Sequence, residues 1–320
     1  MPLEPLLGDL ACPRCRGRLS EEASGLSCGT CRHSYRMARG QPVLVDFEQS
    51  ILIEQEVEAG SGASTIRRRT GTGSARARVA RNLLPRNRAA PGNARRFADL
   101  VTALARRPRV LIVGGASQGE GTALLLSDPS IDVVAFDLYA SELTQFIADA
   151  HQIPLADESV DGVWIQAVLE HVLDPWRVAG EIHRVLRAGG IVYAETPFLQ
   201  QVHEGAYDFT RFTESGHRWL FRRFELVDSG VVLGPASQLL WSIEHVVRGL
   251  TRSVRAGVAA KMMLFWLRWL DRLIPRAFAS DAASAVYFLG RKAGPETRPR
   301  DIIAFYKGAH RRRDQGNSSA

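Results

Sequence analysis

An apolar run that ends in glycines is the feature of this sequence that most restricts its fold. Residues 109–121 read RVLIVGGASQGEG, so a predicted buried strand leads directly into a loop with glycines at 114, 115, 119 and 121. Glycine allows backbone conformations and close ligand approaches that other residues prevent. Asp137 closes the next apolar run, where a carboxylate can bind ribose hydroxyls. The pattern predicts a nucleotide-binding βαβ unit.

The spacing of these glycines argues against a dinucleotide. A dinucleotide fingerprint needs glycine at positions 114, 116 and 119, and the middle glycine lets the backbone approach the pyrophosphate. Ala116 occupies that middle position. The sequence therefore disfavours NAD as the ligand.

Four further landmarks follow the glycine loop and Asp137 in order. They read DAHQIPL over 149–155, DESVDGVWI over 157–165, VLEHV over 168–172 and LRAGGIV over 186–192. This succession closely resembles class I S-adenosylmethionine-dependent methyltransferases, and the resemblance covers about residues 95–292. It implies S-adenosylmethionine as the cofactor and an α/β fold with a doubly wound, seven-stranded, mostly parallel sheet.

Alternating apolar and helical patterns support that architecture. We expect strands near 109–113, 132–136, 160–165 and 190–195, separated by helices over 119–126, 141–148 and 176–187. A further helix over 93–106 should lead into the first strand. The resemblance implies that the last two strands, 224–233 and 285–289, pair antiparallel.

The resemblance also implies the cofactor contacts. Ligands of open α/β sheets lie beyond the carboxyl ends of the strands, so the loops there should hold the cofactor. The glycine loop would line the methionine moiety, Asp137 would bind the ribose, and Asp149 with the Ala150 backbone would contact the adenine. Asp149 could instead cap a turn. The complete predicted set is Gly114, Gly115, Gly119, Asp137, Leu138, Asp149, Ala150 and Gln166.

All four cysteines lie in the first 31 residues, in two C-x-x-C pairs. Cys12, Cys15, Cys28 and Cys31 can surround one cation with four thiolates, which is the closed tetrahedral site of structural zinc. Two disulfides in a secreted domain are the alternative, which the missing signal-peptide pattern disfavours. The stretch around Tyr35–Val45 resembles the small zinc-ribbon proteins that partner tRNA and protein methyltransferases.

Composition divides the rest of the chain. We expect a zinc ribbon over residues 1–48, a basic flexible linker over 49–94, the methyltransferase domain over 95–292 and a basic mobile tail over 293–320. The ribbon and the methyltransferase domain should then have separate cores. The formal net charge is +7, which suggests an anionic partner, although basic segments are often only solvated.

A long segment, 236–275, precedes the last expected strand. Two amphipathic helices fit it, one with apolar positions from Leu239 to Leu250 and one from Met262 to Leu273. Packing against the core or a dimer partner explains such faces. The alternative is a lid or interfacial helix for a lipid-linked substrate, because Trp266 and Trp269 beside arginines suit a bilayer boundary.

Two segments offer a base for methyl transfer to an alcohol. His171 follows the fourth strand, and the segment from His203 to Thr213 follows the fifth. In the second segment, Tyr207–Thr213 resembles a His-Asp-Phe-x-Arg-Tyr-Thr stretch of bacterial methyltransferases associated with cell-surface glycans, with Tyr207 in place of the histidine. The catalytic candidates are His203, Glu204, Asp208 and His171.

These inferences predict a methyltransferase for a hydroxyl of a small or lipid-linked acceptor such as a sugar. One alternative is an rRNA guanine methyltransferase, with Arg67, Arg68 and Arg69 on phosphates. Another is a non-catalytic partner protein that uses the fold as a scaffold. We expect a cytoplasmic protein that can contact the inner face of a membrane through residues 239–274.

Overall fold

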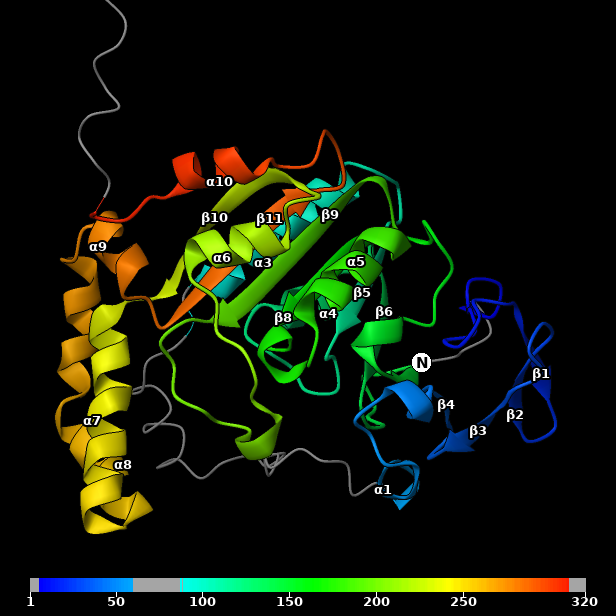
Figure 1. The fold of residues 1–320 in the computed structure, drawn as a ribbon, viewed down its shortest axis with the longest axis horizontal. Coiled ribbons are helices and arrows are strands. Elements are labelled where there is room, and N and C mark those ends of the chain that lie inside the picture. Colours follow the sequence, from blue (N-terminus) through cyan, green and yellow to red (C-terminus); the bar gives the residue numbers. More distant parts are fainter. Residues whose placement is uncertain (1–5, 60–86, 88, 311–320) are drawn as a thin grey trace, which may run out of the picture.

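The computed structural model describes residues 6–59, 87 and 89–310 (Figure 1). The strands of these residues form one 11-stranded sheet in the order β1-β2-β3-β4-β7-β6-β5-β8-β9-β11-β10. The sheet therefore runs from an N-terminal module, through the centre of the molecule, to the last strands of the chain.

Seven of these strands form the predicted doubly wound sheet. Only β11 among them runs opposite to its neighbours, since it pairs antiparallel with β9 and with β10, while the other pairs are parallel. The prediction of a mostly parallel α/β sheet is thus confirmed. The seven strands are β7 (Phe146–Ala148), β6 (Asp132–Asp137), β5 (Arg109–Val113), β8 (Val160–Gln166), β9 (Leu186–Pro197), β11 (Ala285–Arg291) and β10 (Glu225–Leu233).

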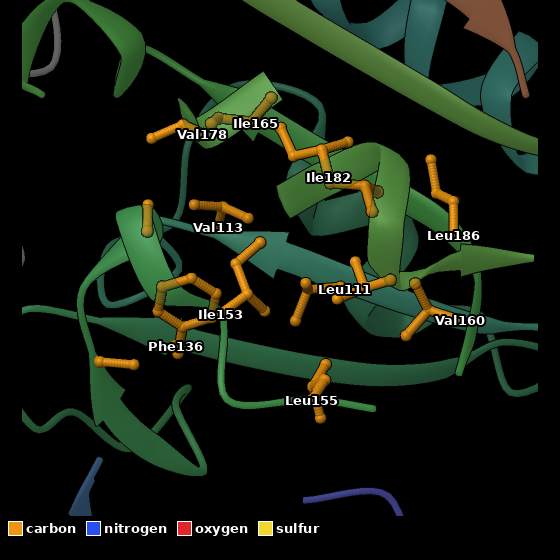
Figure 2. Close-up of a cluster of buried hydrophobic side chains, with 14 of the residues drawn as sticks. Leu111, Val113, Phe136, Ile153, Leu155, Val160, Ile165, Val178, Ile182 and Leu186 are labelled. Carbon is orange, nitrogen blue, oxygen red and sulfur yellow. The ribbon is translucent and has the colours of Figure 1, made fainter. Parts of the chain in front are cut away.

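Helices cover both faces of this sheet because successive strand residues point to opposite sides. On one face, α5 (Pro175–Val185) and α6 (Glu214–Leu220) pack on a cluster that includes Leu111 and Phe136 (Figure 2). On the other face, α3 (Ala89–Thr102) and α4 (Thr122–Ser127) pack on their own cluster. That second cluster includes Val110, Ile112, Trp164 and Tyr193.

The expected helix over 141–148 is wrong, because residues 146–148 form strand β7, between β4 and β6. The eight residues from 138 to 145 are fewer than the dozen or so that a helical crossover needs. The Gln145 side-chain carbonyl accepts a 2.5 Å hydrogen bond from the Ala135 backbone amide. The Gln145 backbone amide donates to the Ala135 carbonyl at 2.9 Å. These bonds hold the short connection against β6.

The N-terminal module extends the same sheet. It contains β1 (Leu19–Glu22), β2 (Gly25–Cys28), β3 (Ser34–Ala38) and β4 (Gln41–Leu44), followed by the 3-10 turn η2 (Phe47–Gln49) and helix α1 (Glu54–Ala59). Strand β4 pairs parallel with β7, with Val43 opposite Ile147. A bridge between Leu10 and Leu155 adds a second contact. The N-terminal module is therefore docked on the main sheet of its own chain (Figure 1).

The expectation of separate cores is wrong. Leu10, Leu26 and Tyr35 of the ribbon belong to the same buried cluster as Phe146 and Leu155 of the main domain. A module of under 50 residues buries too little apolar surface to be stable by itself without a metal or a partner surface. The main domain supplies that surface here.

Of the predicted linker, residues 60–86 and 88 lie outside the described residues, and with them Arg67, Arg68 and Arg69. Helix α3 begins at Ala89, four residues before the expected start. Of the predicted mobile tail, residues 293–310 are held on the domain. The Thr297 amide donates to the Arg222 carbonyl at 2.8 Å, and Tyr306 donates to Asp281 at 2.7 Å after helix α10 (Pro299–Phe305).

The insert before β11 forms α7 (Pro235–Thr251), α8 (Val254–Met263), the 3-10 segment η6 (Phe265–Arg272) and α9 (Arg276–Asp281). The first expected helix is present. The second, over 262–273, is wrong as a single helix, because α8 ends at Met263 and 3-10 turns follow. Within the described part of the chain, no helix is long and apolar enough to span a membrane.

Candidate functional site

The predicted cofactor residues meet beyond the carboxyl ends of β5, β6, β7 and β8. Gly114 and Gly115 donate to the Phe136 carbonyl at 3.0 and 2.9 Å, which turns the chain sharply at the end of β5. Gly114 has a φ of 76°, and a Cβ there would collide with the Val168 side chain. A Cβ at Gly119 would lie 2.7 Å from Oε1 of Gln166. Gly114 is therefore required by its backbone conformation and packing, whereas a side chain at position 119 would displace the end of the Gln166 side chain.

Asp137 connects the glycine loop to the end of β6. Its Oδ2 accepts a hydrogen bond from the Ala116 amide at 2.9 Å, and its Oδ1 accepts one from the Leu138 amide at 2.7 Å. The contact of this carboxylate with the ribose hydroxyls stays a prediction. The contact between Ala116 and Asp137 uses only the backbone of Ala116, so it does not require a glycine at this position.

Asp149 caps the 3-10 turn η3 (Ala150–Gln152), as the alternative interpretation proposed. Its Oδ1 accepts from the amide and from Nδ1 of His151 at 2.9 and 2.6 Å, and its Oδ2 accepts from Ser50 of the N-terminal module at 2.5 Å. Burial alone would raise the pKa of Asp149, but the contacts with His151 and Ser50 lower it overall. The adenine contact of Asp149 and Ala150 stays a prediction.

A buried carboxylate that the sequence analysis missed lies beside the glycine loop. Glu195, at the end of β9, accepts from Asn87 at 2.6 Å, from Tyr193 at 2.9 Å and from Gln166 at 3.3 Å. Burial raises its pKa. Oε1 of Gln166 is buried and has no hydrogen-bond partner among the described residues, so it can accept from a cofactor beside Gly119.

Three polar side chains meet next to this loop, from two segments far apart in the sequence. Glu170 and His171 lie in the 3-10 turn η4 (Leu169–His171) after β8, and His203 lies in the loop after β9. The two histidine Nε2 atoms are 3.1 Å apart. Oε1 of Glu170 lies 3.7 Å from Nε2 of His171 and 3.8 Å from Nε2 of His203. Burial raises the pKa of Glu170 to about 8 and lowers that of His171.

The remaining catalytic candidates, Asp208 and Glu204, lie in the same loop as His203. Asp208 accepts from the His203 amide at 2.9 Å and from Arg211 at 2.8 Å. Burial opposes ionisation of Asp208, but these contacts hold its pKa at about 2, so it is a poor proton acceptor. Glu204 is buried at the start of the 3-10 turn η5 (Gly205–Tyr207). Glu170 was part of the predicted VLEHV landmark but was not identified as a site residue.

The four cysteines converge as predicted. Sγ of Cys12 is 3.7 Å from that of Cys31, Sγ of Cys15 is 3.4 Å from that of Cys28, and all four lie within 4.8 Å of one another. Thiolates about 2.3 Å from one zinc ion are separated by distances of this order. The Tyr35 hydroxyl lies 3.0 Å from Sγ of Cys12 and can donate to it. The residues fit a structural zinc ion, with all four positions filled by protein.

Comparison with known proteins gives a match to one protein family. Residues 112–194 match the model of a family described as a methyltransferase domain. No curated protein matches the chain.

Several solved structures share parts of the fold. A phosphoethanolamine N-methyltransferase 2 of Haemonchus contortus has 15% identity and a TM-score of 0.41, covering 66% of this chain and 55% of that chain. The 1,6-didemethyltoxoflavin-N1-methyltransferase of Burkholderia thailandensis has 19% identity and a TM-score of 0.39, covering 64% and 79%. A chain of the complex between the Haloferax volcanii Trm112 methyltransferase activator and a methyltransferase has 16% identity and a TM-score of 0.39, covering 65% and 94%.

Proposed function

This chain is a class I S-adenosylmethionine-dependent methyltransferase, and from that premise we propose that its acceptor is a hydroxyl of a small or lipid-linked molecule, such as a sugar. The observation that carries the proposal is the cluster of Glu170, His171 and His203. An alcohol must lose its proton as it is methylated, whereas a neutral amine can be methylated before it loses one. Three electron-rich atoms beside the cofactor loop suit an alcohol.

The position of the cluster supports the same conclusion. Val168, against which Gly114 packs, lies two residues before Glu170. An acceptor on the cluster would therefore lie next to the methionine end of the predicted cofactor site. The bound cofactor would supply a methyl group on a sulfonium. In the absence of a metal, a histidine Nε2 would accept the proton that the acceptor hydroxyl loses.

The insert lies on the acceptor side of the site, which supports a lipid-linked molecule. The Gln201 side chain, two residues before His203, donates to Ser242 of α7 at 3.0 Å. Trp266 and Trp269 of the insert are 45% and 47% exposed. Exposed tryptophans beside basic residues are typical of surfaces that contact the lipid headgroup region.

The test uses methyl-labelled S-adenosylmethionine with lipid and glycan extracts in one arm and total RNA in the other. We expect base-stable label, as in a methyl ether, in the lipid or glycan arm. His203→Ala should lower turnover by about 10²–10⁴-fold while cofactor affinity, measured by calorimetry, stays nearly unchanged. His245→Ala, an exposed histidine of α7, is the matched control. Label in RNA that is lost on replacing Arg67, Arg68 and Arg69 together would instead identify the nucleic-acid alternative.

The lipid part of the proposal has its own measurement. Replacing both Trp266 and Trp269 with alanine should abolish association with liposomes, because these side chains supply the exposed apolar area of η6. Trp176→Ala is a suitable control, since Trp176 is also 49% exposed but lies on α5, on the ribbon side of the molecule. Unchanged association of the double variant would limit the acceptor to small water-soluble molecules.

A further inference from the structure

The surroundings of His171 and His203 determine which ring nitrogens carry hydrogen. Nδ1 of His171 lies 2.7 Å from the Tyr207 carbonyl oxygen, which can only accept a hydrogen bond. Nδ1 of His203 lies 3.3 Å from Oδ2 of Asp208 and 3.4 Å from the Gln201 carbonyl, and both are acceptors. Hydrogen on each Nδ1 satisfies these contacts, and this tautomer leaves a lone pair on each Nε2.

The two lone pairs point at the same small volume. The Nε2 atoms are 3.1 Å apart, a hydrogen-bond distance at which two rings in this tautomer have no hydrogen to donate. Oε1 of Glu170 faces the same volume from 3.7 and 3.8 Å. With Glu170 ionised, three acceptor atoms gathered in this way repel one another, and a metal cation or a proton between them removes the repulsion.

We propose that Glu170, His171 and His203 form a binding site for a divalent transition-metal ion of the zinc and cobalt class. Nitrogen and oxygen ligands about 2.0–2.2 Å from such an ion lie about 2.8–3.6 Å apart in octahedral or tetrahedral geometry. The observed separations of 3.1, 3.7 and 3.8 Å are close to this range. Two histidines and one carboxylate with an open position form a donor set that zinc and iron enzymes use.

Two further observations support a metal at this place. Metal-binding histidines usually donate their second ring nitrogen to a carbonyl or carboxylate, which is the role of the Tyr207 carbonyl and of Asp208 here. The Glu170 side chain is 1% exposed, and its Oε2 has no hydrogen-bond partner among the described residues. A buried carboxylate left in this state is costly, and a cation would compensate it.

The site differs in kind from the four-cysteine cluster. Among the described residues three ligands face the ion, so a fourth position would remain for an acceptor oxygen, whose pKa the ion would lower. In this respect the inference rests on the proposed function and refines it: with the ion bound, the Nε2 atoms would be ligands, and the proton of the acceptor hydroxyl would pass to solvent water instead of to a histidine. Metal binding itself does not depend on the acceptor and can be measured on the protein alone.

The experiment is a titration of the full, metal-depleted chain with Co²⁺, with total bound metal measured by elemental analysis. Thiolate-to-cobalt charge-transfer absorption reports the four-cysteine site, so the remaining cobalt reports the nitrogen and oxygen site. We expect two ions per chain in the wild type. Glu170→Gln and His203→Ala should each weaken the second ion by at least about 100-fold and keep the thiolate absorption, which also shows that the variants are folded.

His245→Ala serves as the histidine control and should retain both ions. One ion per chain in the wild type, all of it thiolate-bound, would overturn the proposal, as would a second ion that survives the His171→Ala/His203→Ala double variant. The proposed function has a separate outcome. Loss of the second ion without loss of turnover would contradict the hydroxyl mechanism while leaving the metal site in place.

Discussion

The molecule has two clusters of ligand atoms, and they are built in opposite ways. The four cysteines come from residues 12–31, where two tight turns and a hairpin bring the thiolates together. The cluster of Glu170, His171 and His203 joins two loops that are 32 residues apart in the sequence and meet only because β8 and β9 are neighbours in the sheet. The spacing of the cysteines in the sequence predicts the first cluster, whereas the second can be found only when the order of the strands in the sheet is known.

The two clusters also differ in what they support. The cysteine cluster is part of a ribbon whose apolar side chains belong to the main core, so its metal should stabilise the whole chain. The histidine cluster lies on loops at the edge of the domain, and the side chains of His171 and His203 are 19% and 28% exposed. Local packing depends on it little, which leaves it available for chemistry.

The largest effect that tests this contrast is on folding. Cys12→Ser with Cys31→Ser should lower the free energy of unfolding of the entire chain by on the order of 5 kcal/mol or more, because zinc contributes about 10–16 kcal/mol to small zinc-binding peptides. His203→Ala should cost less than about 1 kcal/mol. Chemical denaturation followed by tryptophan fluorescence measures both. If the main domain unfolds at the same denaturant concentration with and without the metal, its contacts with the ribbon do not contribute to its free energy of unfolding, which would contradict the prediction.

A middle-sized effect concerns the cofactor. Asp137→Ala should weaken S-adenosylmethionine binding by about 1.5–3 kcal/mol, because the charge-assisted hydrogen bonds to the ribose and to the loop amides are lost. Isothermal titration calorimetry gives the value. Asp128→Ala, a half-buried turn residue bonded to Ser130 at the other end of β6, should leave the affinity unchanged. Equal effects of the two variants would remove Asp137 from the cofactor site.

The smallest effect comes from a third histidine, His217, which belongs to neither cluster. His217 is 1% exposed, has no partner for either ring nitrogen among the described residues, and burial lowers its pKa to about 3. The unfolded chain takes up this proton near pH 6.5 and the folded chain does not, so stability falls as the pH drops below 6.5. Between pH 7 and pH 5 the loss should be about 2 kcal/mol.

His217→Phe should remove this loss, since Phe221 and Phe288 already surround the ring. Denaturation curves of both proteins at pH 7 and pH 5 give the difference. An unchanged pH dependence in the variant would show that His217 is protonated in the folded state and has a partner outside the described residues.

The order of landmarks was enough to predict the fold and the glycine loop. Gly114 has a left-handed backbone in the turn that follows its strand, and Asp137 follows its strand directly, so these positions depend on neighbours in sequence. The same holds for the paired cysteines. The failure at 141–148 has a local cause too, because apolar periodicity does not reveal that a connection is too short for a helix.

By itself, then, the sequence determined the features that arise within a strand and the turn that follows it: the parallel sheet, the glycine loop and the four-thiolate cluster. Only the tertiary structure decided that β4 extends the sheet at β7, that Ser50 of the N-terminal module bonds Asp149, and that Glu195 and Glu170 lie at the site. The reason is that strand order sets these contacts, and strand order follows from how the whole core packs. No window of residues along the chain contains that information.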